Sequence, residues 1–172
     1  AHGVAPAVRA QAAARRLAVL DASCPFVLKV HAEVARFARH GCTIAYIGHR
    51  NHEEVIGVCG EAPEQVTVLE TPAEAERFQP PDPDRVAVAM QTTWSAAEAG
   101  RVLAVLRRRF PRLRTPPKGD ICYATTNRQE AVKALAGRVG TILVLGGRNS
   151  SNTLRLAEVA QQAGARAFRL SE

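Results

Sequence analysis

Short apolar segments alternate with amphipathic segments along most of this 172-residue chain. The apolar runs predict buried strands at 17–21, 43–48, 65–69, 86–90, 141–145 and 167–170. Apolar residues at helical spacing predict helices at 7–16, 25–40, 71–78, 95–110, 127–137 and 151–163, with a further short helix after His52. Strands that are apolar throughout and separated by helices are typical of parallel sheets covered on both faces. The sequence therefore predicts an α/β fold.

Two segments rich in proline predict irregular structure between these elements. The segment 79–84 carries three prolines and two aspartates, which is typical of a surface loop. The segment 114–119 carries two prolines and a glycine, and we interpret it as a linker and as the best internal domain boundary.

The charge balance favours an anionic partner or a solvated basic face. The formal net charge is +7, from 23 Lys and Arg residues against 16 Asp and Glu residues. Several arginines (107–109, 112 and 114) follow one predicted helix, where cations also complement the helix dipole. Aromatic residues make up only 5% of the chain and no nucleic-acid recognition pattern is present, so we expect a small phosphorylated ligand and no nucleic acid. A basic nucleic-acid-binding protein stays open as an alternative.

The thiols and the hydropathy pattern bear on the compartment. No run approaches the roughly 18 apolar residues of a membrane span, and no signal peptide is visible, so we expect no membrane partner. The four cysteines (Cys24, Cys42, Cys59 and Cys122) do not resemble a secreted disulfide framework. Free thiols in a reducing cytoplasm fit better.

Cys24 lies where a predicted strand turns into a predicted helix. Pro25 occupies the first helical position, where proline is common, and Gly41 ends the apolar pattern that follows. The free N–H groups and the dipole at a helix start favour an anion, so a thiolate at Cys24 suits metal binding. A small buried core cysteine is the alternative reading.

Polar side chains follow several of the predicted strands. His52 and Glu54 follow the strand at 43–48, Thr92 and Thr93 follow the strand at 86–90, and the polar run 149–152 follows the strand at 141–145. Ligands of open parallel sheets bind beyond the carboxyl ends of the strands, so these groups could converge on one crevice. Taken singly, each also reads as a helix cap or a turn, and neither a GxGxxG nor a GxxxxGK[ST] sequence is present.

Six motifs together carry a family resemblance. In chain order they are Ala-His-Gly-Val at 1–4, Asp-Ala-Ser-Cys-Pro at 21–25 with Lys-Val-His at 29–31, Gly-His-Arg-Asn-His-Glu-Glu-Val at 48–55, Gln-Thr-Thr at 91–93, Asp-Ile-Cys-Tyr-Ala-Thr-Thr-Asn-Arg-Gln at 120–129 and Asn-Ser-Ser-Asn at 149–152. This set resembles the 4-hydroxy-3-methylbut-2-enyl diphosphate reductases, iron–sulfur enzymes that end the non-mevalonate isoprenoid pathway. The resemblance runs over essentially the whole chain.

The resemblance implies a trefoil-type arrangement of small α/β domains around a 4Fe-4S cluster, with a diphosphate substrate between them. The implied reaction removes an allylic hydroxyl with two electrons and protons, giving isopentenyl and dimethylallyl diphosphate, and a donor such as ferredoxin or flavodoxin supplies the electrons. Cys24 and Cys122 would be cluster ligands, and Glu54 and Thr92 would deliver the proton. The implied substrate-binding residues are His2, His52, Thr92, Ser150, Ser151 and Asn152.

The resemblance also implies an internal fragment. By this reading, 1–24 is the end of a first domain, 25–118 a complete second domain and 119–172 the first part of a third. The family's remaining cluster cysteine has no counterpart here, since Cys42 and Cys59 match no ligand position, so we expect the 172-residue chain alone to be inactive. A phosphosugar- or nucleotide-binding α/β module without cluster chemistry stays as the alternative function.

Overall fold

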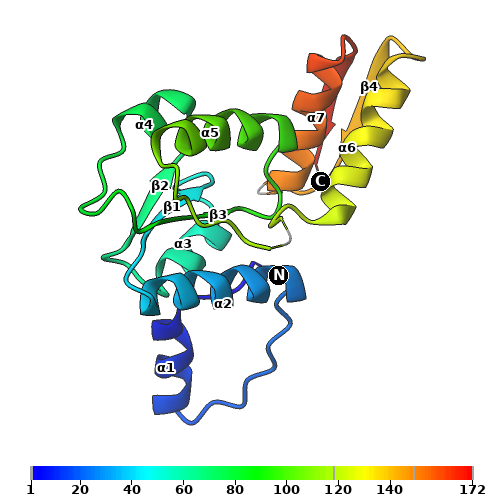
Figure 1. Cartoon of the computed structure of the whole chain (residues 1–172). Coiled ribbons are helices and arrows are strands. Elements are labelled where there is room, and N and C mark those ends of the chain that lie inside the picture. Colours follow the sequence, from blue (N-terminus) through cyan, green and yellow to red (C-terminus); the bar gives the residue numbers. More distant parts are fainter. Residues whose placement is uncertain (1, 118, 149, 172) are drawn as a thin grey trace. The chain divides into compact units, whose positions relative to one another are not determined.

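The computed structural model describes residues 2–117, 119–148 and 150–171. The chain forms two compact units, one from Ala1–Thr92 with Ala97–Asp120 and the other from Thr93–Ala96 with Ile121–Glu172. Each unit contains a parallel sheet with helices packed on it, which confirms the α/β class (Figure 1). The division into domains at 24/25 and 118/119 stays a prediction.

The sheet of the first unit has three parallel strands in the order β2-β1-β3. The central strand β1 (Thr43–Ile47) pairs Ile44 with Val66 of β2 (Val66–Leu69) and with Ala87 of β3 (Val86–Met90). All five residues of β3 are buried, as expected for a strand with both faces covered. The predicted linker begins at this sheet, because the Arg114 backbone forms hydrogen bonds of 2.9 Å with Val86 and Val88.

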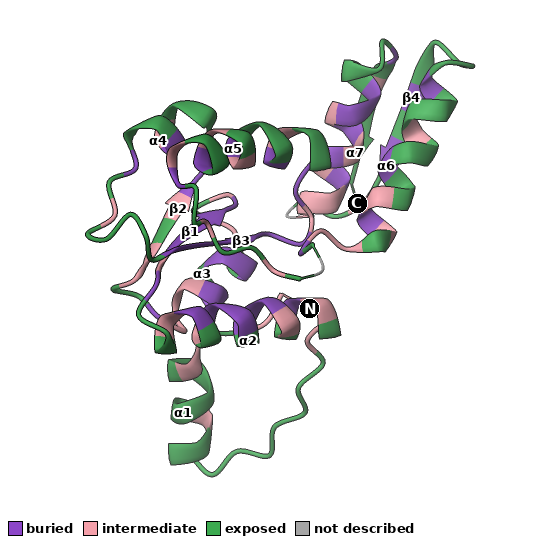
Figure 2. Ribbon diagram, viewed as in Figure 1, coloured by how far each residue is buried: buried purple, intermediate pink, exposed green. Residues whose placement is uncertain are grey.

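Helices cover both faces of this sheet (Figure 1). The helices α2 (Pro25–Arg39) and α3 (Glu53–Cys59) lie on one face, and α4 (Pro72–Arg77) and α5 (Ala96–Arg109) lie on the other. The first face holds a continuous apolar core, whose residues are among those coloured as buried in Figure 2. Its members come from α2, β1, α3, β3 and the turns beside them: Val30, Val34, Phe37, Cys42, Ile44, Tyr46, Val55, Val58, Ala62, Ala87 and Ala89. The helix α1 (Pro6–Ala14) precedes this core and has no buried residue of its own.

The second unit is a smaller layered structure. It consists of α6 (Tyr123–Ala136), β4 (Thr141–Leu145), α7 (Ser151–Gln162) and β5 (Arg166–Leu170), and β4 pairs in parallel with β5. Alternate residues of β4 are buried against the helices, whereas Leu143 and Leu145 are exposed. The expectation that helices cover both faces is therefore met in the first sheet and not in the second.

One predicted strand is wrong. Residues 17–21 have no regular secondary structure, and Leu17, Val19 and Leu20 are exposed. An apolar run becomes a strand only when a neighbour completes its backbone hydrogen bonds, and the strand pairings in the described part of the chain do not include these residues.

One predicted helix begins too late. The helix α6 begins at Tyr123, four residues before the predicted start at 127, and Cys122 is its N-cap. The Cys122 carbonyl accepts from the backbone N–H groups of Thr125 and Thr126 at 2.9 and 3.1 Å. Thr125 and Thr126 made the sequence of this first turn look non-helical, because β-branched residues have low helix propensity. None of the described helices is long and apolar enough to cross a membrane.

Candidate functional site

A buried carboxyl group lies at the carboxyl edge of the first sheet. Glu54 belongs to the first turn of α3, and its side chain has no exposed surface. Thr92, two residues beyond β3, donates to it twice: its backbone N–H lies 2.7 Å from Oε1 and its hydroxyl 2.8 Å from Oε2. Burial raises the pKa of Glu54, and the two Thr92 hydrogen bonds lower it in part. The predicted meeting of these two residues is therefore present.

Two histidines lie next to this carboxyl group. His52 is the N-cap of α3, and its Nδ1 accepts from the Glu54 backbone N–H at 3.2 Å. The ring of His2 contacts the ring of His52 edge to face with centroids 4.9 Å apart, and its Nδ1 lies 3.0 Å from the Glu53 carboxylate. The geometry therefore links His2, His52, Glu53 and Glu54 within the first unit.

His52 has an unused donor. Because Nδ1 accepts a hydrogen bond, the hydrogen of the neutral ring lies on Nε2. Nε2 is buried and has no hydrogen-bond partner among the described residues. Burial, followed by the charges of His2 and His49, lowers the pKa of His52, which favours this neutral form. An oxygen of an anionic ligand would complete the bond that Nε2–H lacks.

The turn between β1 and α3 leaves no room for larger residues. A Cβ at Gly48 would lie 2.8 Å from the Tyr46 ring and 2.9 Å from Val55, so only glycine fits there. The backbone N–H of His49 donates to Oε1 of the buried Gln91 at 3.0 Å. Gln91 comes directly before Thr92, so this bond fixes the turn beside the Glu54–Thr92 pair.

The cysteines fall into two groups. Cys24 and Cys122 are half-buried N-cap residues of α2 and α6, and neither side chain makes a capping hydrogen bond. Cys42 is fully buried in the core, and burial raises the pKa of Cys59 to about 11. Two uncommitted thiols at helix starts fit iron–sulfur ligation. No group of three or more potential metal-ligating side chains occurs in the described residues.

The second unit holds the polar run after β4. Ser150 is the N-cap of α7 and accepts from the Thr153 backbone N–H at 3.2 Å, and Ser151 accepts from the Thr93 hydroxyl at 3.2 Å. Oδ1 of Asn152 is buried without a hydrogen-bond partner in the part of the chain that the structure describes. The first residue of the motif, Asn149, lies outside the described residues.

The predicted site residues divide between the two units. Cys24, His2, His52, Glu54 and Thr92 lie in the first unit, whereas Cys122, Ser150, Ser151 and Asn152 lie in the second. In the first unit Glu54 contacts Thr92 and His2 contacts His52. In the second unit Ser151 bonds to Thr93. Their convergence on one crevice stays a prediction.

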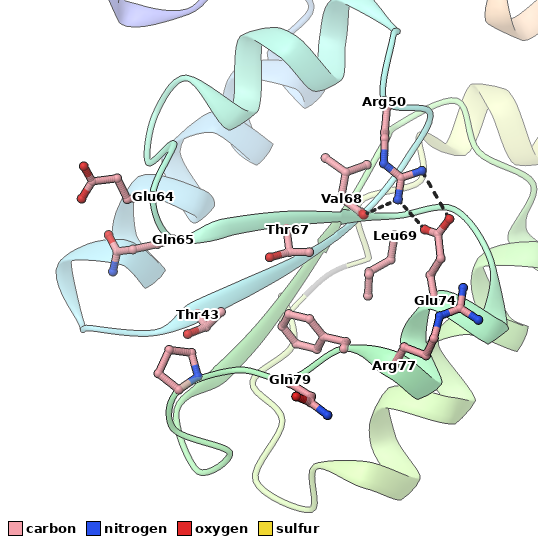
Figure 3. A pocket seen from close by; sticks show the side chains of 12 residues that line it. Thr43, Arg50, Glu64, Gln65, Thr67, Val68, Leu69, Glu74, Arg77 and Gln79 are labelled. Carbon is pink, nitrogen blue, oxygen red and sulfur yellow. Dashed lines mark hydrogen bonds and ion pairs between the residues drawn. The ribbon is translucent and has the colours of Figure 1, made fainter.

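A separate cavity of about 490 Å³ lies along the outer edge of β2 (Figure 3). Thr43, Thr67 and Gln79 contribute to its wall, and none of the predicted site residues is among its twelve lining residues. The Arg50 guanidinium group in this wall donates to the Glu74 carboxylate at 2.6 Å and to the Val68 carbonyl at 3.1 Å. Its charge is therefore already neutralised within the protein.

The sequence did not predict two buried ionic groups, Asp120 and His31. Asp120 is fully buried, accepts from Lys29 Nζ at 3.1 Å and from the Met90 backbone N–H at 2.9 Å, and has its pKa raised to about 7 by burial and by Glu33. His31 is also buried, and its Nδ1 lies 2.7 Å from the Glu61 carboxylate. The only signal in the sequence is that Lys29, His31 and Asp120 belong to the motifs that carry the family resemblance. Nothing in their spacing reveals a partner.

Comparisons with known proteins identify the family of this chain. A family model described as LytB protein matches residues 1–172. The chain belongs to the LytB family. A LytB-family relative in Acidothermus cellulolyticus, named 4-hydroxy-3-methylbut-2-enyl diphosphate reductase, is 56% identical over 97% of this chain and 49% of its own length. A relative of the same name in Rhodopirellula baltica is 51% identical over 98% of this chain and 53% of its own length.

Solved structures give the same result for this LytB chain. The E-1-hydroxy-2-methyl-but-2-enyl-4-diphosphate reductase of Plasmodium falciparum matches with a TM-score of 0.94 and 35% identity over 99% of this chain and 54% of that one. A second structure, of an (E)-4-hydroxy-3-methyl-but-2-enyl diphosphate reductase described as the terminal enzyme of the non-mevalonate pathway, matches with a TM-score of 0.64 and 31% identity over 99% of this chain and 60% of that one. The predicted family is confirmed, and the chain spans about half the length of the curated relatives it matches.

Proposed function

We propose that this chain is part of a 4-hydroxy-3-methylbut-2-enyl diphosphate reductase, which removes the allylic hydroxyl and forms isopentenyl and dimethylallyl diphosphate. The relatives' names support the reaction. The observation that carries the proposal is the buried Glu54–Thr92 pair beside His2 and His52. This cluster places a candidate proton donor, Glu54, beside candidate anion-binding histidines in a chain of the LytB family.

Glu54 holds the proton for the departing hydroxyl. Burial raises its pKa, so a larger fraction of the carboxyl groups is protonated near neutral pH than in water. Thr92 orients both carboxyl oxygens through its N–H and hydroxyl groups. A carboxylic acid with a raised pKa is a suitable general acid, because it both carries and releases its proton at the working pH. The hydroxyl oxygen would therefore leave as water.

The candidate diphosphate-binding residues are histidines of the first unit and, in the second unit, residues at the start of α7. His52 donates from its unused Nε2–H, and His2 lies against the same ring. Ser150, Ser151 and Asn152 would present hydroxyl and amide groups at a helix N-terminus, where the dipole favours an anion. Thr92 would also contact the substrate through its hydroxyl.

A 4Fe-4S cluster would supply the electrons and a Lewis-acid iron for the hydroxyl. Cys24 and Cys122 would hold it, because both are free, half-buried and not used in capping. Cys42 and Cys59 lie in or against the apolar core, so we assign neither as the third ligand. We propose ferredoxin or flavodoxin as the class of electron donor and the cytoplasm as the location.

The proposal is tested by turnover. The protein at its natural length, reconstituted anaerobically with iron and sulfide, should convert 4-hydroxy-3-methylbut-2-enyl diphosphate to the two isomeric diphosphates when a strong reductant is added. The 172-residue chain alone should show no turnover. A reconstituted protein that binds sugar phosphates or nucleotides without an absorbing cluster, and that does not turn over this substrate, would contradict the proposal and favour a phosphosugar- or nucleotide-binding module.

A further inference from the structure

The segment around Gly3 packs between α2 and α3 of the first unit. Gly3 adopts a positive φ of 71°, and a Cβ there would lie 2.6 Å from Nε2 of His31 and 3.0 Å from Val27 on α2. A Cβ at Gly57 of α3 would lie 3.5 Å from both the Gly3 carbonyl and the His31 ring. Gly3 therefore fits closely against His31 on one side and α3 on the other, and no larger residue would fit there without movement.

The His31 side chain is fixed from its other end. Its Nδ1 lies 2.7 Å from the Glu61 carboxylate, and the same carboxylate accepts from Arg9 of α1 at 2.9 Å. Only 4% of His31 is exposed, and its Nε2 has no hydrogen-bond partner among the residues that the structure describes. Burial of Nε2 without a hydrogen-bond partner costs free energy, because the atom loses its hydration. The close approach of Gly3 to Nε2 explains why this atom has no such partner.

We infer that His31, oriented by Glu61, is a positioning residue that holds Gly3 and thereby sets the place of the His2 ring in the diphosphate site. His2 comes directly before Gly3, and its ring contacts His52 and the Glu53 carboxylate, so a shift of Gly3 displaces it. The inference rests on the proposed function, since it requires that His2 binds the diphosphate. It adds His31 and Glu61, neither of which is placed at the substrate.

The test measures binding of inorganic pyrophosphate by calorimetry to the protein at its natural length. His31→Asn keeps a donor toward Glu61 but removes the ring that supports Gly3. It should weaken pyrophosphate binding by about 10-fold, the size expected when a hydrogen-bonding contact to a charged group is displaced. The substrate KM should rise by a similar factor while kcat changes much less, because the hydrogen bonds to Glu54 come from Thr92 and the charge of His31 is the smallest of the influences on the Glu54 pKa.

Three further variants make the result decisive. Gly3→Ala should cause a similar loss of pyrophosphate affinity, because its Cβ cannot fit beside His31; it serves if His31→Asn does not fold. His40→Asn is the matched control at the C-cap of the same helix, since His40 is exposed and its Nδ1 bonds to the Arg36 carbonyl of α2. It should bind pyrophosphate as the parent does. His2→Ala tests the proposed function itself and should weaken binding.

The outcomes separate the two claims. Normal pyrophosphate affinity in His31→Asn and Gly3→Ala, with weakened affinity in His2→Ala, would overturn the positioning role and leave the proposed function intact. Normal affinity in His2→Ala would overturn the assignment of His2 and the positioning role with it. A parallel loss of kcat and affinity in His31→Asn would also contradict the inference, since it would indicate a general disturbance of the site.

Discussion

At the residue scale, Glu54 owes its raised pKa to burial. Burial raises the pKa of Glu54 in the protein alone, before a diphosphate or a cluster adds negative charge nearby. The two bonds from Thr92 stabilise the ionised form and so limit the shift. The Glu54 carboxyl group therefore holds its proton more tightly than a carboxyl group in water does, before any substrate binds.

Replacement of Glu54 by Gln should separate turnover from binding. The amide keeps the size of the side chain and can still bond to Thr92, so the fold and the pyrophosphate affinity should be retained. Because the amide cannot release a proton, kcat should fall by about 10²- to 10⁴-fold, the usual contribution of a general acid. Steady-state kinetics together with calorimetry check this. A normal kcat with a large loss of affinity would make Glu54 a binding residue.

The same carboxyl group should give the stability of the first unit a defined pH dependence. The folded pKa of Glu54 is raised above its ordinary value of 4.5, so the native state holds this proton more tightly than the unfolded chain does. The free energy of unfolding should therefore fall as pH rises from 4.5 through the folded pKa. Glu54→Gln should remove this decline and gain stability relative to the parent above that range, as urea unfolding of the cluster-free protein would show.

The neighbouring Glu53 is the matched control. Its carboxylate is exposed, and the hydrogen bond from His2 lowers its pKa. A lowered folded pKa adds stability that is lost as pH falls, so Glu53→Gln should give a change of opposite sign. Identical pH profiles for the parent and Glu54→Gln would show that burial does not shift the Glu54 carboxyl group.

At the element scale, helix ends were predicted best where a residue leaves few alternatives. Pro25 and Gly41 placed both ends of α2 within one residue. The start of α6 was missed because Tyr123 and its neighbours carry no comparable signal, yet Cys122 occupies the N-cap position of α6 just as Cys24 occupies that of α2. The two proposed cluster ligands, Cys24 and Cys122, therefore both lie at the N-cap of a helix, but only the sequence around Cys24 predicted this position.

Two glycines should respond to alanine in opposite directions. Gly41 follows α2 with φ of 68°, a conformation that costs an L-residue about 1 kcal/mol, so Gly41→Ala should destabilise the protein by about that amount. Gly100 lies inside α5, and a Cβ there would meet nothing within 4 Å. Gly100→Ala should therefore stabilise the protein by about 0.5–1 kcal/mol. Chemical denaturation compares the two, and a loss of stability at Gly100→Ala would contradict the helix assignment.

At the scale of the whole molecule, local patterns predicted more than long-range partners. The α/β class, the strands of both sheets and the meeting of Glu54 with Thr92 follow from apolar periodicity and from the rule for strand ends. The segment 17–21 was mistaken for a strand because apolar residues alone do not supply a neighbour. The pairs His31–Glu61 and Lys29–Asp120 join residues 30 and 91 positions apart, and no local pattern encodes such contacts.

The central claim is that this chain supplies two thiolates, and not four, to an iron–sulfur cluster. The most direct measurement is the visible absorbance and iron content of four Cys→Ser variants of the protein at its natural length after anaerobic reconstitution. Cys24→Ser and Cys122→Ser should lose the brown absorbance and most of the iron, because each removes a free thiol at a helix start. Cys42→Ser and Cys59→Ser should keep both signals, since these thiols pack in or against the core. Retention of a full cluster in Cys24→Ser or Cys122→Ser, or equal loss in Cys59→Ser, would contradict the account.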